Sequence, residues 1–247
     1  MERKLSARME PFDSYWQAPE DVEKGYASFH QYYKSNFVGH LPDDRESRIL
    51  VVSCGPGYFV KLLNDLGYRR VLGIDSDPEK VRHAERRNLD CRVARAFPFL
   101  EEHPGEFDLI MCEQELNHLT KDEMVEFLGL CRAGLKPGGS LIVYAVNGAN
   151  PITGAESLAQ NFDHFHTLTE YSLRQALEYC GFEAIRAFPL KLYVFYGNPL
   201  NYVGLAVTVL LETAFRVLFK LYGKSNRIFT KKIAAVCRRP SAQAQEA

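Results

Sequence analysis

The stretch Arg48-Ile-Leu-Val-Val-Ser-Cys-Gly-Pro-Gly-Tyr-Phe59 decides how the rest of this 247-residue chain is interpreted. Four apolar residues in a row, Ile49 to Val52, are typical of a fully buried strand. The Gly55-Pro56-Gly57 turn allows the backbone to approach a ligand closely before a helix begins at about Tyr58. A strand, a glycine turn and a helix in this order predict a nucleotide-binding site.

An acidic residue at the end of the next predicted strand supports this interpretation. The short apolar run Val71 to Ile74 is followed by Asp75, eighteen residues after Gly57. A carboxylate at this place can accept hydrogen bonds from both hydroxyls of a ribose, and we expect it to have no packing role. The alternative is a tight strand-to-helix turn with no ligand, which the glycines alone do not exclude.

Composition and charge limit the class of protein. With 46% apolar residues the chain can bury one substantial core, so one α/β domain with additions is expected. The formal net charge of −1 disfavours nucleic acid as a partner, because such binding usually requires a strongly basic face.

The six cysteines lack Cys-x-x-Cys spacing, which favours reduced thiols, and no metal site is predicted. The chain begins without an apolar run, so a cytoplasmic location is expected.

Six short motifs follow one another along the chain in a specific order. They are Val-Val-Ser-Cys-Gly-Pro-Gly (51–57), Gly-Ile-Asp-Ser-Asp-Pro (73–78), Phe-Asp-Leu-Ile (107–110), Asn-His-Leu (117–119), Leu-Lys-Pro-Gly-Gly (135–139) and Cys-Gly-Phe (180–182). Together they resemble the class I S-adenosylmethionine-dependent methyltransferases over residues 45–190. The resemblance implies a Rossmann-like three-layer α/β sandwich around a seven-stranded, mostly parallel sheet of strand order 3-2-1-4-5-7-6.

The expected division of the chain follows from this core. The predicted parts are an N-terminal arm and helical cap (1–44), the cofactor-binding core (45–190), a helical insertion (191–231), the last core strand (232–239) and a flexible tail (240–247). Within the cap, one aromatic face is expected to pack on the domain or to line the pocket. Its residues recur at helical spacing and are Val22, Tyr26, Phe29, Tyr33 and Phe37.

The resemblance also implies the cofactor, S-adenosylmethionine. Gly55 and Gly57 would admit its methionine part, Asp75 would hold its ribose, and Ala96 and Phe97 would contact its adenine. The predicted cofactor-binding residues are Ser53, Cys54, Gly55, Gly57, Asp75, Ser76, Ala96, Phe97 and Glu113. Three positions depart from the pattern of relatives: Val51 and Arg95 replace acidic residues, and Ser53 replaces a glycine.

The candidate catalytic residues lie after the fourth predicted strand and in a later loop. Methyl transfer from a sulfonium requires positioning and, for an oxygen nucleophile, removal of a proton. His118 and His164 are candidate bases because imidazole titrates near neutral pH. Asp163 is a third candidate, and we expect it to act by itself because residues adjacent in sequence rarely face each other. For each histidine the alternative is a structural role.

The insertion contains an unusually apolar helix, predicted over residues 201–220. Its polar stripe is narrow: Thr208, Glu212, Arg216 and Lys220. A membrane span is disfavoured, because Glu212 and Arg216 would each cost about 2.5 to 3.5 kcal/mol at the bilayer centre. From Thr213 to Gln245 the chain has eight basic and no acidic residues, which favours peripheral contact with an anionic membrane through residues 200–232. The alternative is a lid or dimer helix buried in protein.

Three functions are compatible with these features. The favoured one is O-methylation of a sugar or other small hydroxylated acceptor, lipid-linked or close to the inner face of the membrane, as in surface-polysaccharide biosynthesis. Quinone methylation is the alternative within this class. A nicotinamide-dependent oxidoreductase is disfavoured, because Val60 stands in the place of the third glycine. The third is a non-catalytic domain that binds the cofactor or only a partner.

Overall fold

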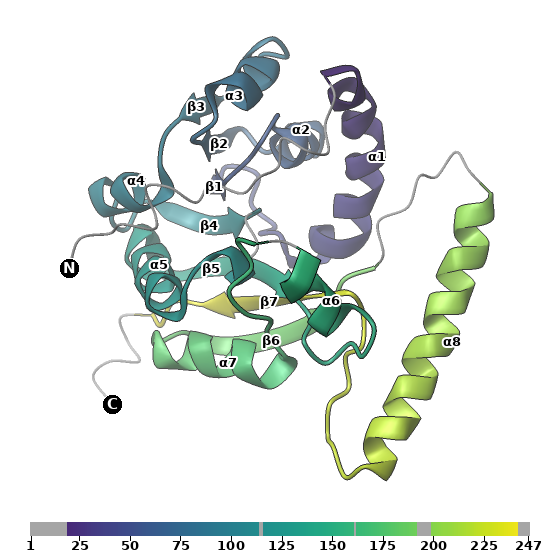
Figure 1. Ribbon diagram of the computed structural model, residues 1–247. Coiled ribbons are helices and arrows are strands. Elements are labelled where there is room, and N and C mark those ends of the chain that lie inside the picture. Colours follow the sequence, from purple (N-terminus) through teal and green to yellow (C-terminus); the bar gives the residue numbers. More distant parts are fainter. Residues whose placement is uncertain (1–18, 114–115, 161, 192–198, 242–247) are drawn as a thin grey trace.

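A seven-stranded sheet organises the chain in the computed structural model, which describes residues 19–113, 116–160, 162–191 and 199–241. The strand order is β3-β2-β1-β4-β5-β7-β6 (Figure 1), which confirms the predicted fold class. The strands are β1 (Arg48–Val52), β2 (Arg70–Asp75), β3 (Cys91–Val93), β4 (Phe107–Cys112), β5 (Leu135–Val146), β6 (Glu183–Pro189) and β7 (Lys232–Arg238).

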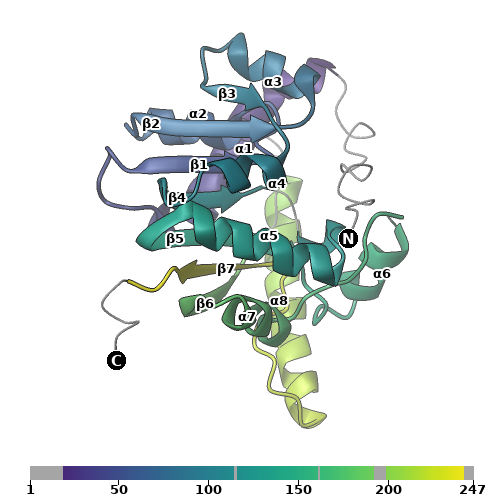
Figure 2. The ribbon, with the colours of Figure 1, turned by 90° about the vertical axis from the view of Figure 1, so that its left-hand side faces the viewer.

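The first five strands in sequence are parallel, and β7 runs antiparallel to both β5 and β6. Helices cover both faces of the sheet, so the domain has three layers (Figure 2). The central strand β1 has no exposed side chain from Ile49 to Val52. The helices are α1 (Pro19–Phe37), α2 (Tyr58–Asp65), α3 (Pro78–Glu85), α4 (Ala96–Glu102), α5 (Lys121–Gly134), α6 (Thr153–Gln160), α7 (Glu170–Tyr179) and α8 (Leu200–Leu221).

Local sequence signals fix where several helices begin. The Asp77 side chain accepts hydrogen bonds from the backbone N–H groups of Glu79 and Lys80, and Pro78 occupies the first helical position of α3. Thr120 and Glu123 form the predicted capping box of α5, each side chain bonding to the other residue's backbone N–H. These caps place the loops that precede α3 and α5 at the carboxyl edge of the sheet.

Two strand boundaries differ from what the sequence pattern predicts. The pattern predicts a third strand over about Leu89 to Val93, but Leu89 N still donates to Ala84 O at the end of α3, and β3 begins at Cys91. The pattern predicts a helix end and a tight turn over Leu135 to Gly139, but this segment is already part of β5, because Leu135 pairs with Phe107. The register then shifts before Leu109 pairs with Ser140, so the glycines form an irregularity inside a strand.

The two helical additions differ in how they meet the domain. The predicted aromatic face of α1 packs on α2, with Phe37 fully buried and the rings of Phe29 and Tyr58 stacked at 4.9 Å between centroids. By contrast, α8 stands beside the domain (Figure 1). Among the described residues, only the segment Tyr202–Leu221 is long and apolar enough to cross a membrane, and none of it is buried. The division of the chain into five parts stays a prediction.

Candidate functional site

The glycine turn lies at the carboxyl end of β1 and leads directly into α2. Gly55 and Gly57 have positive φ angles of 53° and 82°, a left-handed conformation that favours glycine. A Cβ atom at Gly57 would lie 2.9 Å from Leu89 Cδ1, whereas one at Gly55 would have no heavy atom within 4 Å. Gly57 therefore permits close packing, and Gly55 leaves its side of the turn open to a ligand.

Asp75 holds this turn against β2. It is 8% exposed, and its two carboxylate oxygens accept hydrogen bonds from Gly55 N (2.8 Å) and Asp77 N (2.9 Å). Burial raises the pKa of Asp75, and the two backbone N–H groups oppose this shift. The expectation that Asp75 has no packing role is wrong, because the carboxylate connects the turn to the strand. Its predicted contact with a ribose, and that of its half-buried neighbour Ser76, stay predictions.

Ser53 and Cys54 contribute to the turn in different ways. Ser53 has a φ of 56°, the left-handed conformation expected at a position where relatives carry glycine. The Cys54 side chain is 2% exposed and packs against Gly73, where a Cβ would lie 2.7 Å from its sulfur. A hydrogen bond with Cys91 and burial raise the pKa of the Cys54 thiol. The Cys54 side chain therefore belongs to the core, and the cofactor contacts of Ser53 and Cys54 stay predictions.

The predicted adenine contacts lie at the start of α4, directly after β3. Phe97 is 9% exposed, and its ring packs against Phe127 of α5 with centroids 5.7 Å apart. Ala96 is partly exposed beside it. The structure gives Phe97 a role in the core, and the adenine contact of both residues stays a prediction.

Glu113 directly follows β4. Its carboxylate is close enough to Asp75 for the two negative charges to repel each other. Its backbone N–H donates to Val52 O (2.9 Å), and its carboxylate accepts a hydrogen bond from the Tyr33 hydroxyl of α1. Burial raises the pKa of Glu113 to about 8; the Tyr33 hydrogen bond lowers it and the Asp75 charge raises it further. Its Oε1 atom is buried with no partner among the described residues. A buried acceptor without a donor fits a cationic ligand group such as the ammonium of S-adenosylmethionine.

Two tyrosine hydroxyls fix this part of the site. Tyr26 of α1 donates to Pro56 O in the glycine turn (2.5 Å), as expected for a cap helix that reaches the pocket. Tyr144 of β5 donates to Glu113 O. Sequence reasoning missed Tyr144; a hydroxyl in an otherwise apolar strand was the available signal.

The three predicted catalytic residues come together at the same edge. Asp163 is 5% exposed, and its Oδ2 accepts a hydrogen bond from His118 Nδ1 at 2.9 Å. His164 Nδ1 donates to Ser157 O at 2.6 Å, and the rings of His118 and His164 meet edge to face with centroids 4.5 Å apart. The expectation that Asp163 acts by itself is wrong, because it pairs with His118 across 45 residues.

Backbone contacts bring the two segments to each other. Phe165 N donates to Asn117 O (2.9 Å), and the buried Asn117 side chain accepts from Val146 N in β5 (3.2 Å). The short turn Leu116–His118 is therefore fixed to both the later loop and the sheet. This arrangement orients an imidazole with a buried carboxylate behind it, which is how a general base is commonly positioned.

The same trio could also hold a metal ion. One ligand atom from each of His118, Asp163 and His164 lies within 4.8 Å of the others. Two imidazoles and a carboxylate are common ligands of divalent transition metals. The absence of a metal site therefore stays a prediction from the sequence.

The chain was compared with protein families and with known proteins. Residues 49–139 match the methyltransferase domain family. A ubiquinone biosynthesis O-methyltransferase of Xanthomonas campestris pv. campestris is 32% identical over 125 residues, 46% of this chain and 51% of that protein. The chain thus spans about half the length of the curated relatives it matches.

Solved structures share the fold over more than nine-tenths of the chain. A S-adenosylmethionine-dependent methyltransferase from Archaeoglobus fulgidus superimposes with a TM-score of 0.59 at 18% identity, covering 92% of this chain and 96% of that one. The phosphoethanolamine N-methyltransferase 2 of Haemonchus contortus, in complex with S-adenosylmethionine, gives 0.58 at 14% identity, covering 95% and 61%. The family match over residues 49–139, the strand order and the structural neighbours confirm the predicted fold and agree with the resemblance to class I S-adenosylmethionine-dependent methyltransferases, which supports S-adenosylmethionine as the cofactor.

Proposed function

We propose that the protein transfers the methyl group of S-adenosylmethionine to a hydroxyl oxygen of a small acceptor, with His118 as general base. The observation that carries this proposal is the 2.9 Å hydrogen bond between His118 and the buried Asp163, at the edge of the sheet that holds the glycine turn. An amine acceptor with a free lone pair needs no such base, whereas a hydroxyl must lose its proton.

The hydrogen bond sets the state of the imidazole. The Asp163 carboxylate can only accept, so the proton lies on His118 Nδ1, and Nε2 keeps its lone pair. Nε2 would take the hydroxyl proton as the oxygen–methyl bond forms and the sulfur–methyl bond breaks. The sulfonium becomes a neutral thioether, and the imidazolium that forms is stabilised by Asp163.

Donor binding is assigned to the turn and to two carboxylates. Asp75 has lone pairs left beyond its two backbone hydrogen bonds, and these would receive the ribose hydroxyls. Glu113 would hold the methionine ammonium through its Oε1 atom. Ser53, Cys54 and Gly55 would approach the methionine part through their backbone.

The acceptor class has two candidates that share a hydroxyl group. The sequence favoured a sugar, lipid-linked or close to the cytoplasmic face of a membrane. A phenolic quinone precursor is supported by the name of the Xanthomonas relative, which is 32% identical over its matched part. A phenol ionises more readily than a sugar hydroxyl, so it would depend less on the strength of the base.

The proposal is tested in two stages. Calorimetry with S-adenosylmethionine and, separately, with a nicotinamide cofactor should show binding of the first alone; no heat would favour a non-catalytic domain. Purified enzyme is then incubated with donor and a panel of sugars, polyprenyl phenols and amines, and products are identified by mass spectrometry. Methylation of amines only would contradict the role given to His118.

The sheet topology argues against the oxidoreductase alternative. Dinucleotide-binding domains have the strand order 3-2-1-4-5-6, with every strand parallel. Here the antiparallel β7 lies between β5 and β6. Calorimetry with the nicotinamide cofactor tests the oxidoreductase alternative directly.

A further inference from the structure

Helix α8 turns Thr208 and Glu212 of its polar stripe toward the domain and much of its apolar surface outward, whereas Arg216 and Lys220 of the stripe are exposed. The partly buried side chains recur at helical spacing and mark its inner face: Leu205, Thr208, Glu212, Phe215 and Phe219. Glu212 and Thr208 of the polar stripe belong to this inner face, and burial raises the pKa of Glu212 despite the Arg216 charge. A helix that only shields a soluble domain would have the opposite orientation.

The attachment of α8 lies near its C-terminal end. Phe215 and Phe219 pack against Phe229, with centroids 6.3 and 4.6 Å apart, and the Arg216 guanidinium donates to Arg227 O at 3.4 Å. Arg227 N donates in turn to Glu170 Oε1 of α7 at 2.9 Å. The chain after α8 thus holds the helix to the domain, and the outward face of α8 is not covered by any described residue.

The outward face is a continuous apolar stripe. Val203, Leu210, Val217 and Leu221 lie opposite the inner face at helical spacing and are 61%, 71%, 56% and 77% exposed. Tyr202, Val209 and Leu218 flank them and are also exposed. Exposed apolar surface of this extent on one element marks an interaction site.

The charge of the side chains next to the outward face of α8 indicates what kind of surface this face binds. The basic side chains at the end of α8 and in the following loop are exposed: Lys220, Lys224, Arg227 and Lys231. No acidic residue lies between Thr213 and Gln245 in the sequence, and Glu170 of α7 meets this loop at the backbone N–H of Arg227. An apolar stripe beside predominantly positive charge complements a surface of anionic phospholipid headgroups over acyl chains, whereas a second copy of the same basic stripe would repel it.

The connections of α8 exclude a transmembrane orientation. Both flanking strands belong to the same sheet, and Pro189 at the end of β6 pairs with Ile233 at the start of β7. If α8 crossed a bilayer, the non-helical residues 222–231 would have to return through it with unpaired backbone groups and three basic side chains. The helix is therefore suited to lie in the plane of the interface.

We infer that α8 docks the protein on an anionic membrane surface, with the stripe Val203, Leu210, Val217 and Leu221 inserted and the basic side chains on the headgroups. This goes beyond the proposed reaction, because docking requires neither donor nor acceptor. It also explains why the helix is kept at the side of the domain (Figure 1), where it would hold the site beside a lipid-soluble acceptor.

The experiment is flotation of the full chain with phosphatidylcholine vesicles, with and without phosphatidylglycerol. Wild-type protein should float with the anionic vesicles only. The double substitution Leu210→Ser with Leu221→Ser, and the triple substitution Lys220→Gln, Lys224→Gln and Lys231→Gln, should each lower the bound fraction roughly tenfold or more. Matched control substitutions at exposed apolar positions on other elements, Val93→Ser with Tyr179→Ser, should leave flotation unchanged.

Thermal unfolding of every variant distinguishes lost docking from lost folding, because all substituted side chains are exposed. Wild-type protein that floats with neither vesicle would overturn the inference. So would apolar variants that float as well as wild type. A concentration-dependent dimer in light scattering that dissociates in the Leu210 and Leu221 variant, without flotation, would identify a second copy as the partner instead. Because no methyl donor is present, failure here leaves the proposed reaction standing.

Discussion

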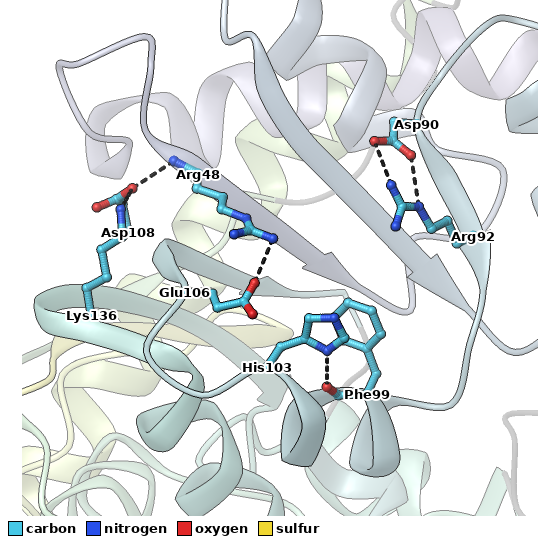
Figure 3. A network of polar contacts seen from close by, with 8 residues as sticks. All are labelled: Arg48, Asp90, Arg92, Phe99, His103, Glu106, Asp108 and Lys136. Atoms are coloured by element: carbon cyan, nitrogen blue, oxygen red, sulfur yellow. Dashed lines mark hydrogen bonds and ion pairs between the residues drawn. The ribbon is translucent and has the colours of Figure 1, made fainter.

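The carboxylates at the two edges of the sheet differ in whether cationic side chains contact them. At the amino edge, Asp108 accepts hydrogen bonds from Arg48 N (2.8 Å) and Lys136 Nζ (2.7 Å), and the Arg48 guanidinium pairs with Glu106 at 2.6 Å (Figure 3). At the carboxyl edge, Asp75 and Glu113 have no side-chain cation in hydrogen-bond contact among the described residues. The carboxylates of the amino edge are hydrogen-bonded or paired with cationic side chains, whereas among the described residues those of the carboxyl edge are hydrogen-bonded by backbone N–H groups and a tyrosine hydroxyl, with Lys80 acting on Asp75 through its charge.

The pKa shifts record the same difference. Burial works to raise the pKa of Asp108, but the hydrogen bonds from Lys136 and Arg48 N outweigh it and lower the pKa. Burial raises the pKa of both Asp75 and Glu113. For Asp75 the backbone hydrogen bonds and the Lys80 charge do not outweigh burial, and for Glu113 the Tyr33 hydrogen bond does not. Buried carboxylates whose charge is incompletely compensated are unfavourable for folding and typical of ligand sites. The comparison therefore assigns stability to the amino edge and ligand binding to the carboxyl edge.

The largest expected effect is on kcat, when one histidine at each edge of the sheet is replaced by glutamine. His118→Gln removes the proposed base, so kcat should fall about 10²- to 10⁴-fold while donor affinity stays unchanged. Asp163→Asn should lower kcat less, because the imidazole remains but loses its orienting carboxylate. His103→Gln is the matched control, since His103 Nδ1 contacts only Phe99 O at 2.7 Å near the amino edge (Figure 3).

Steady-state kinetics and donor calorimetry measure both quantities. Full activity in His118→Gln would show that His118 is not the base, and His164 would then be the remaining histidine candidate. Equal losses in His118→Gln and His103→Gln would mean that histidine replacement acts through folding, and the distinction between the edges would fail.

A second comparison exchanges one aspartate at each edge. Asp75→Asn should weaken donor binding roughly tenfold to a hundredfold, since charge-assisted hydrogen bonds to the ribose hydroxyls are lost. It should also lower the free energy of unfolding by about 1 to 3 kcal/mol, because an amide cannot accept from both Gly55 N and Asp77 N. Asp108→Asn should affect unfolding alone.

Donor calorimetry and denaturant unfolding of the two variants separate these effects. Unchanged donor affinity in Asp75→Asn would show that the ribose lies elsewhere. Weakened donor binding in Asp108→Asn would show that the amino edge is not purely structural.

The pH dependence of stability should have opposite signs at the two edges. The folded pKa of Glu113 is raised from its ordinary 4.5 to about 8, so its contribution is fully present below pH 4.5 and is lost as pH rises to about 8. The folded pKa of Asp108 is lowered below 3.8, so its contribution is present above pH 3.8 and is lost as pH falls further.

Chemical denaturation of wild type and of variants at each edge, between about pH 2 and 9, measures both contributions. Burial lowers the pKa of the half-buried His166, so other groups also make stability depend on pH. The Glu113 contribution is therefore read from the difference between wild type and Glu113→Gln. Relative to wild type, the variant should gain stability as pH rises toward 8. A constant difference across this range would show that Glu113 ionises normally.

Sequence patterns predicted the parts of this molecule that depend on neighbouring residues. The turn at Gly55 and Gly57 and the aromatic face of α1 follow from local patterns, and the strand order follows from the resemblance. Contacts made across long stretches of chain were not predictable. The Asp163–His118 pair joins residues 45 apart and the Tyr33–Glu113 pair residues 80 apart, and both depend on where loops and helices pack on the sheet.

The same limit applies to α8. The sequence showed one polar stripe on an apolar helix, but not which side would face the domain. That orientation depends on Phe229 and Arg227, which lie beyond the helix and hold Phe219 and Arg216. The sequence predicts a division of the chain into five parts, but it does not show how these parts pack together.

The smallest expected effect concerns metal removal, which asks whether the carboxyl edge needs a cation from solution. Binding a metal through the Nδ1 atoms of His118 and His164 would replace the His118–Asp163 hydrogen bond of 2.9 Å and the bond from His164 Nδ1 to Ser157 O of 2.6 Å. A trio already engaged in this way is better suited to orienting a base. Dialysis against a chelator should therefore leave the methylation rate unchanged, and added zinc should inhibit by occupying the base. Loss of activity on chelation that magnesium or zinc restores would make the trio a metal site and His118 a ligand.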